Sequence, residues 1–189
     1  MEEFIIKKNS EVADEILDKV LEFDRTIFPE DEEYSFPDGY FRKIYSKNKD
    51  GIFVLFDRNN NVIGYVNCIF ITDKNVEEFL ETREYLNLEN IGINKGENNL
   101  YLYNLLIKEE YRDGQAIKLI MKEFCKWLNE EIKNGKKIKY CFSEAVTYDG
   151  IKTLKVMKML PQDVNEDGIG IYYSKDNLEE YISNMLRMG

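Results

Sequence analysis

A polar turn, Arg112-Asp113-Gly114-Gln115-Ala116, carries residue types that can hold a phosphate group. It follows an apolar run, Leu100 to Ile107, that contains no glycine or proline and is typical of a strand covered on both faces. Where a strand turns into a helix, the first backbone N–H groups of the helix have no partner within it and bind anions. Because a guanidinium also recognises phosphate, we predict an anion site at Arg112 and this turn.

The segment after the turn predicts a long amphipathic helix, because its apolar residues recur at three- and four-residue steps. These residues are Ala116, Ile117, Ile120, Met121, Phe124, Trp127, Leu128 and Ile132. Asn134-Gly135 is suited to a left-handed cap at the helix end. A second strand is expected from Ile138 to Val146, so that strand, helix and strand form a βαβ unit with parallel neighbours.

Histidine is absent from the sequence, which excludes a Ser-His-Asp triad, a Cys-His pair and a histidine general base. Cys68, Cys125 and Cys141 are widely spaced inside apolar segments, so we expect buried reduced thiols and no metal site. Proton transfer must therefore fall to Glu, Asp, Tyr, Lys or water.

Length and composition favour one domain over residues 1–189, since 189 residues with 43% hydrophobic content can bury a substantial core. No run approaches the roughly 20 apolar residues that span a bilayer. The acidic start, Met1-Glu2-Glu3, lacks the basic and apolar regions of an export signal. We therefore expect a soluble, cytoplasmic protein with no membrane partner.

The charge balance is acidic, with 36 acidic residues against 26 basic ones and a net charge of −10. This charge repels phosphate backbones, so we expect no nucleic-acid partner. A cationic amine or a lysine-rich peptide suits such a field, although a net charge of this size also serves solubility.

The patterns before residue 72 predict strands, helices and a hairpin. Ser10 is expected to cap a helix that runs to Phe28 and is closed by Pro29. The other elements expected here are a strand at Phe4–Ile6, a short helix around Phe41 to Tyr45, and antiparallel strands at Ile52–Phe56 and Val62–Ile71 joined through Asp57 to Asn61.

The patterns after residue 72 complete an alternating order. A helix is expected at Val76 to Tyr85, and Asp149 is expected to cap a helix ended by Pro161. Ile169 to Tyr173 predicts a last strand, and Leu178 to Leu186 a final helix. The predicted order, β α α β β (α) β α β α β α, is that of a mixed α/β (α+β) layer fold.

This order, with its turn after the fourth strand, resembles the GNAT superfamily of acetyl-CoA-dependent acyltransferases over most of Phe4 to Tyr173. Ile107-Lys-Glu-Glu-Tyr-Arg112 is similar to the family's hydrophobic-x-Pro-Glu-Tyr-Arg run before its cofactor loop, with Glu109 at the proline. The loop departs from the family's Gln/Arg-x-x-Gly-x-Gly/Ala by being one residue shorter. The resemblance implies a central mixed, mostly antiparallel sheet with a parallel, splayed strand pair and helices on both faces.

The resemblance also implies a reaction, in which acetyl-CoA is the co-substrate and its acetyl group passes to a primary amine of a small molecule or peptide. No metal is implied. The residues that it places at the cofactor are Leu106, Ile107, Arg112, Gly114, Gln115, Ala116, Ile117, Asp149 and Lys152.

Transfer to an amine requires a base, because an alkylamine with a pKa of about 10 is mostly protonated at neutral pH. Glu144 is the candidate. It precedes Asp149 by five residues, the spacing of the glutamate base in ribosomal-protein acetylases of this superfamily, and Asp149 replaces their asparagine. Glu144 could equally be a strand-edge carboxylate paired with a lysine.

The departing thiolate benefits from a nearby hydroxyl donor. Val156 occupies the position of the family's usual tyrosine, and Leu160-Pro161 stands where the family has Gly-Phe. Tyr148 and Tyr173 are therefore the candidates for this donor.

Carboxylates and aromatic rings between Pro29 and Gly51 lie where the family has its acceptor-side wall, and they suit a cationic substrate; a solvated acidic loop is the alternative. Asn104 interrupts an apolar strand, and because a buried amide needs partners it either binds the pantetheine arm or bonds to a loop. The candidate acceptor-binding residues are Glu33, Tyr34, Tyr40, Tyr103 and Asn104.

Two other functions stay open. With the tyrosine missing and the loop shortened, the chain could bind an acyl-CoA or a partner protein without turnover. It could also be an adaptor whose acidic face binds a basic protein. Exposed sheet edges often pair, which leaves a homodimer open.

Overall fold

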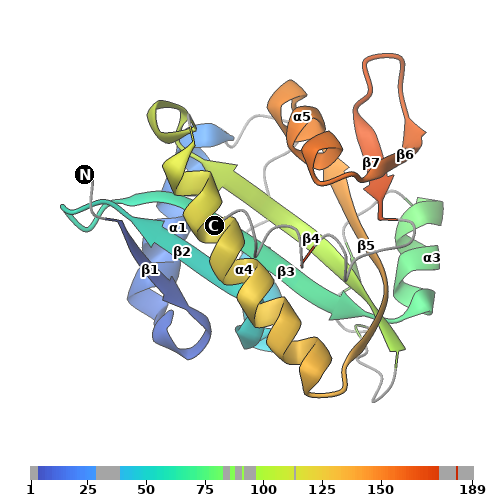
Figure 1. Cartoon of the computed structure of the whole chain (residues 1–189), viewed down its shortest axis with the longest axis horizontal. Helices are drawn as coiled ribbons and strands as arrows, with labels where there is room; N and C mark the ends of the chain where they lie inside the picture. The colour runs from blue at the N-terminus through green and yellow to red at the C-terminus, as the bar shows by residue number, and fades with distance from the viewer. Residues whose placement is uncertain are drawn as a thin grey trace. The chain divides into compact units, whose positions relative to one another are not determined.

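The computed structural model describes residues 4–28, 39–82, 86–87, 91, 97–112, 114–174 and 182. These ranges contain a seven-stranded sheet in the order β1-β2-β3-β4-β5-β7-β6 (Figure 1). The neighbouring strands β4 and β5 are parallel, whereas β1-β2, β2-β3, β5-β7 and β6-β7 are antiparallel. The elements are β1 (Ile5–Lys8), η1 (Asn9–Glu11), α1 (Asp14–Ile27), α2 (Tyr40–Lys47), η2 (Lys49–Gly51), β2 (Ile52–Phe56), β3 (Val62–Ile71), α3 (Asp73–Thr82), β4 (Glu97–Ile107), η3 (Glu109–Tyr111), α4 (Gln115–Lys133), β5 (Lys137–Ala145), α5 (Tyr148–Val156), β6 (Leu160–Val164) and β7 (Gly170–Tyr173).

The chain divides into two compact units. The first comprises Met1–Asn67 and Asn104–Phe124, and the second Cys68–Tyr103 and Cys125–Gly189. A single domain over the whole chain stays a prediction.

In the first unit, β2 is covered on both faces, which explains its uninterrupted apolar sequence. Its alternate residues Ile52, Val54 and Phe56 join a core cluster with residues of α1 and α2. Phe53 points to the other face, where its ring meets Phe124 of α4 edge-on at 6.0 Å. The predicted hairpin of β2 and β3 is confirmed.

In the second unit, aromatic rings pack around the parallel strand pair. Tyr101 of β4 and Phe142 of β5 stack at 4.5 Å, and Phe79 of α3 contacts both rings. Phe70 of β3 packs on Trp127 of α4 at 5.6 Å. The strand-helix-strand arrangement with parallel neighbours is as predicted (Figure 1), and Gly135 follows α4 with a left-handed φ of 94°.

Two predicted helix caps are wrong. Ser10 lies in η1, and α1 begins at Asp14 after Ala13, because a tight turn first buries Val12 in the core. At α5 the cap is Thr147, whose hydroxyl accepts from Gly150 N at 3.1 Å. Thr147 and Asp149 are both capping residue types, and the residue that leaves the strand in an extended conformation becomes the cap.

The C-terminal part differs from prediction in one strand. The helix expected to end at Pro161 ends at Val156, and Leu160–Val164 forms β6, which pairs with β7 (Figure 1). The pattern of β6 did not indicate a strand because it is a mostly exposed edge strand, the place where proline is tolerated. The predicted final helix lies, except for Ile182, outside the described residues, as does Pro29.

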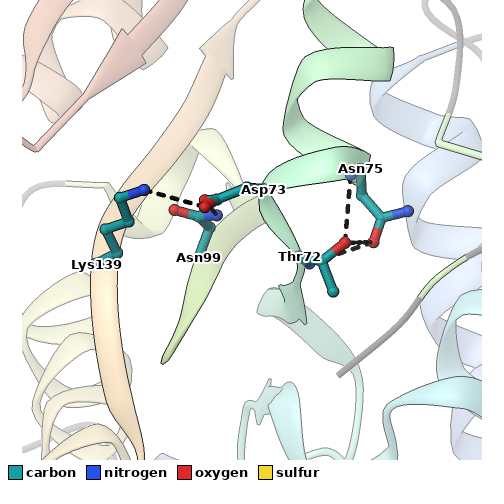
Figure 2. A network of polar contacts seen from close by, with 5 residues as sticks. All are labelled: Thr72, Asp73, Asn75, Asn99 and Lys139. Carbon is teal, nitrogen blue, oxygen red and sulfur yellow. Dashed lines mark hydrogen bonds and ion pairs between the residues drawn. The ribbon is translucent and has the colours of Figure 1, made fainter. Parts of the chain in front are cut away.

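The predicted helix near Val76 is α3, which begins earlier because polar residues at its start bond to one another (Figure 2). Thr72 and Asn75 cap the helix reciprocally, with Thr72 Oγ1 donating to Asn75 Oδ1 at 2.8 Å. Asp73 accepts from Asn99 Nδ2 of β4 at 2.8 Å and from Lys139 Nζ of β5 at 3.0 Å. We call Asp73, Asn99 and Lys139 the strand clamp, since they join α3 to the start of the parallel pair.

The strand clamp predicts a pH effect on stability. The hydrogen bond from Asn99, and then Lys139, lower the pKa of Asp73, so its contribution is present above the unfolded-state pKa and is lost as the pH falls through the folded-state value. Asp73→Asn should lower the unfolding free energy at pH 7 by up to about 1 kcal/mol, since the carboxylate is largely exposed. It should also flatten the decline of that free energy below about pH 4, measured by urea unfolding. The exposed Glu77→Gln on the same helix is the control, and equal curves for the two variants would contradict the clamp.

Candidate functional site

The end of β4 is held by hydrogen bonds to backbone carbonyls on two sides. Lys108 N donates to Ile63 O of β3 at 2.8 Å. On the other side, Arg112 Nε donates to Ile107 O at 2.8 Å, so the guanidinium folds back onto the strand that it follows. The single turn η3 between them places Arg112 at the approach to α4, where its side chain is exposed.

The backbone N–H groups at the start of α4 are arranged as in an anion-binding site. Gly114 has a φ of 140°, a conformation that favours glycine, and no atom of the described residues beyond its chain neighbours lies within 4 Å of where a Cβ would be. Lys118 N donates to Gly114 O, so the N–H groups of Gln115, Ala116 and Ile117 precede the first helical bond. The described first turn contains no acidic side chain that would repel an anion. Asp113 lies outside the described residues.

Gly64 lets β3 approach the end of β4 closely. A Cβ on Gly64 would lie 2.7 Å from Leu106 O and 2.5 Å from Ile107 Cδ1. The sequence reasoning missed this residue, although a glycine inside a strand is a recognised signal of close backbone approach.

The parallel ladder of the second unit ends before its strands do. Among the described residues of β4 and β5, pairing runs from Glu97–Lys137 to Tyr101–Phe142, whereas β4 continues to Ile107 and β5 to Ala145. Beyond the last pair, the buried Ser143 hydroxyl donates to Leu102 O at 2.8 Å. The two strands are therefore no longer paired with each other past this point, although β5 stays paired with β7 through Ala145.

Glu144 and Tyr173 share one face of the β5–β7 pair. Glu144 is opposite Ile171 and Phe142 is opposite Tyr173, which makes Glu144 and Tyr173 diagonal neighbours. Glu144 is exposed and Tyr173 half-buried. The structure therefore brings the predicted base and one predicted hydroxyl donor together.

The start of α5 gathers three other predicted residues. Lys152 Nζ lies 4.4 Å from the ring centre of Tyr148 and 3.5 Å from Asp149 Oδ1. Tyr148 is 70% exposed, and Val156, at the position of the family's usual tyrosine, is 77% exposed. Of the two predicted hydroxyl donors, Tyr173 is thus the one that is partly shielded from water.

The predicted acceptor residues are placed only in part. Tyr40 begins α2, and Tyr103 packs edge-on against Tyr101 at 5.4 Å. Asn104 is buried in β4, and its Oδ1 lies enclosed with no hydrogen-bond partner among the described residues, so none of the described loops bonds to this oxygen. Glu33 and Tyr34 lie outside the described residues.

The cysteines are free and buried, as predicted. Burial raises the pKa of Cys125 and of Cys141 to about 12, and raises the pKa of Cys68 well above its usual value. These thiols are therefore poor nucleophiles at neutral pH.

The described ranges contain no group of three His, Cys, Asp or Glu residues that could hold a metal ion. Every described helix is too short or too polar to cross a bilayer.

The model of the acetyltransferase (GNAT) family matches residues 17–158, which is most of the chain. The chain belongs to the GNAT acetyltransferase family. Transfer of an acetyl group from acetyl-CoA is the activity that defines this family, and the resemblance seen in the sequence is confirmed. No curated protein matches the chain by sequence.

Solved structures of GNAT proteins share the fold at low sequence identity. One is a chain of the NatC complex bound to Gag peptide and CoA, with 10% identity, 90% of this chain and 96% of that chain covered, and a TM-score of 0.60. A mosquito arylalkylamine N-acetyltransferase like 5b has 11% identity, 91% and 99% coverage, and a TM-score of 0.60. Arabidopsis thaliana Naa50 in complex with the bisubstrate analogue CoA-Ac-MVNAL has 14% identity, 92% and 99% coverage, and a TM-score of 0.58.

Gly64→Ala tests whether the β3–β4 approach positions the strand end. Because the new methyl group would meet backbone, we expect a loss of about 1–3 kcal/mol in unfolding free energy, measured by denaturant titration. Gly150→Ala in α5 is the control, because its Cβ would meet only the Thr147 hydroxyl within 3.5 Å. Equal unfolding midpoints for Gly64→Ala and the parent chain would show that the approach is looser than described.

Proposed function

We propose that the chain transfers the acetyl group of acetyl-CoA to a primary amine of a small molecule or peptide. The observation that carries the proposal is the parallel ladder that ends at Tyr101–Phe142 while both strands continue, in a chain of the GNAT family. A net charge of −10 favours a cationic acceptor.

The pyrophosphate of acetyl-CoA is proposed to bind at the start of α4. The N–H groups of Gln115, Ala116 and Ile117 would receive it, with Gly114 leaving room and Arg112 supplying a charge. The bond of Arg112 Nε to Ile107 O fixes the direction of the guanidinium, so less freedom is lost on binding. Asp149 and Lys152 remain candidates for further cofactor contacts.

One backbone donor of the strand end suits the thioester carbonyl. Lys108 N and Leu106 O point toward β3. Because N–H and C=O groups alternate in direction along a strand, the Ile107 N–H points away from β3, on the same side as its carbonyl. Of Leu106 and Ile107, we therefore propose Ile107 as the donor to the oxyanion.

Glu144 is proposed to take the proton of the attacking ammonium, directly or through water. The neutral amine nitrogen then attacks the thioester carbon, the carbon–sulfur bond breaks and the sulfur leaves as a thiolate, while the nitrogen gives up its second proton to water to become the amide. Tyr173, on the same face as Glu144, is proposed to donate a proton to that thiolate. Tyr148 is the second candidate for this step.

A second candidate function is binding of an acyl-CoA without turnover. The position of the family's usual tyrosine holds an exposed Val156, which supplies no proton. Turnover assays therefore decide between the two functions.

Release of thiol from acetyl-CoA should rise on adding primary amines, and Glu144→Gln should reduce kcat/KM by about 100-fold at pH 7. Acetyl-CoA should still raise the melting temperature of this variant, because binding is separate from proton removal. Glu166→Gln, an exposed carboxylate between β6 and β7, is the control. Bound acetyl-CoA with no thiol release by the parent chain would favour the non-enzymatic function.

Arg112→Ala should weaken acetyl-CoA binding by about tenfold or more, because a charge-assisted hydrogen bond is lost. Arg112→Lys should recover only part of the affinity, since an ammonium lacks the planar fork. Calorimetric titration measures both, with Arg58→Ala in the β2–β3 turn as the control. A lower melting temperature with unchanged affinity for acetyl-CoA would show that Arg112 only stabilises the fold through its bond with Ile107 and does not bind the cofactor.

A further inference from the structure

Two buried carboxamides in the first unit have polar atoms that no described residue satisfies. Asn67 of β3 is 1% exposed and Asn104 of β4 is 9% exposed. Asn67 Nδ2 and Asn104 Oδ1 are both enclosed and have no hydrogen-bond partner among the described residues. An enclosed polar group without a partner costs about 1–3 kcal/mol, so two in adjoining strands require an explanation.

The strand register brings these two residues together. Lys108 N bonds to Ile63 O, and Gly64 lies against Leu106 and Ile107. Antiparallel pairing continued at this register places Asn67 opposite Asn104, with both side chains on one face. At that register, one vacant donor and one vacant acceptor lie side by side.

The same face carries a second buried polar pair. Tyr65 precedes Asn67 by two residues, so both side chains leave β3 on the same side. The Tyr65 hydroxyl donates a hydrogen bond to Asp24 Oδ1 of α1. The Asp24 side chain is almost fully buried, and desolvation raises its pKa. The two carboxamides therefore lie next to another buried polar pair on a face that is otherwise apolar.

We propose that Asn67 and Asn104 bind an amide group of the acyl acceptor. Its carbonyl would accept from Asn67 Nδ2, and its N–H would donate to Asn104 Oδ1. The inference rests on the proposed acetyltransferase function and narrows the acceptor to an amine with a primary amide, such as an amino-acid amide, because the carbonyl and N–H of a trans peptide bond point in opposite directions. Because both atoms are enclosed, the two carboxamides rotate toward the acceptor as it binds.

The chemistry of the vacancies excludes simpler acceptors. A protonated alkylamine or polyamine has donors only, so it would leave Asn67 Nδ2 unsatisfied. An amino ester brings a carbonyl but no N–H, so it would leave Asn104 Oδ1 unsatisfied. An amide supplies both groups at adjacent atoms.

Melting temperatures test whether Asn67 Nδ2 and Asn104 Oδ1 lack hydrogen-bond partners in the free protein. Asn67→Leu and Asn104→Leu should leave the melting temperature unchanged or raise it, because an apolar group of similar size replaces an unsatisfied one. The matched control is Asn99→Leu, also in β4, which should lower it because Asn99 donates to Asp73. If all three variants melt lower by similar amounts, bound water or a hydrogen bond between the two carboxamides already satisfies Asn67 and Asn104, and the proposal is wrong.

Acceptor kinetics test the function of the pair. Thiol release is measured with alaninamide and with sec-butylamine, which replaces the carboxamide by an ethyl group, at equal concentrations of neutral amine. We expect the parent chain to prefer alaninamide by about tenfold or more in kcat/KM. In Asn67→Leu and Asn104→Leu this preference should fall to within about twofold, a ratio that a merely structural role would not change.

The outcomes separate the two proposals. Thiol release at equal kcat/KM for the two amines, or a preference that survives both substitutions, overturns the amide site and leaves the acetyltransferase function standing. No thiol release with any amine overturns the acetyltransferase function. The site is then decided by alaninamide alone, which should raise the melting temperature of the parent chain and not that of the two variants.

Discussion

The parallel pairing of β4 and β5 stops partway along the two strands. Each backbone N–H and C=O group past that point needs another hydrogen-bond partner. The structure meets this constraint within each unit. In the second unit, β5 stays paired with β7 through Ala145, and the Ser143 hydroxyl donates a hydrogen bond to the Leu102 carbonyl. In the first unit, the end of β4 is held by Ile63 and by Arg112. Both strand ends are therefore held in place although the parallel ladder has stopped.

The paired end of the same ladder is closed by side chains. Asp73 joins Asn99 and Lys139 near the first pairs, and the rings of Tyr101 and Phe142 stack at the last pair. The parallel pair is thus fixed at both of its limits by contacts within the second unit. Parallel pairing is slightly less stable per residue than antiparallel pairing, so such contacts add stability where the pairing itself is weaker.

Much of the fold could be predicted because the signals are local. The helical period of α4, the glycine after it and the turn residues between β2 and β3 need no distant partner. Ser10 misled because the burial of Val12 delays the start of α1 until after Ala13. Asp149 misled because Thr147, another capping residue type, comes first where the chain leaves β5. At the site, Arg112 was identified by type, whereas its bond to Ile107 depends on the turn that the chain takes.

The part of the site that the sequence does not reveal lies in β3. Gly64 yields room to the end of β4, whereas Tyr65 and Asn67 point to the face that carries Asp24. The residues of this strand that could do chemistry, Tyr65 and Cys68, are fully buried. Its register with β4 joins segments about forty residues apart, which no local pattern specifies. A glycine and an asparagine inside an apolar strand each weaken it. Their presence together is explained if β3 is selected for the shape and polarity of the surface beside β4 as well as for the core.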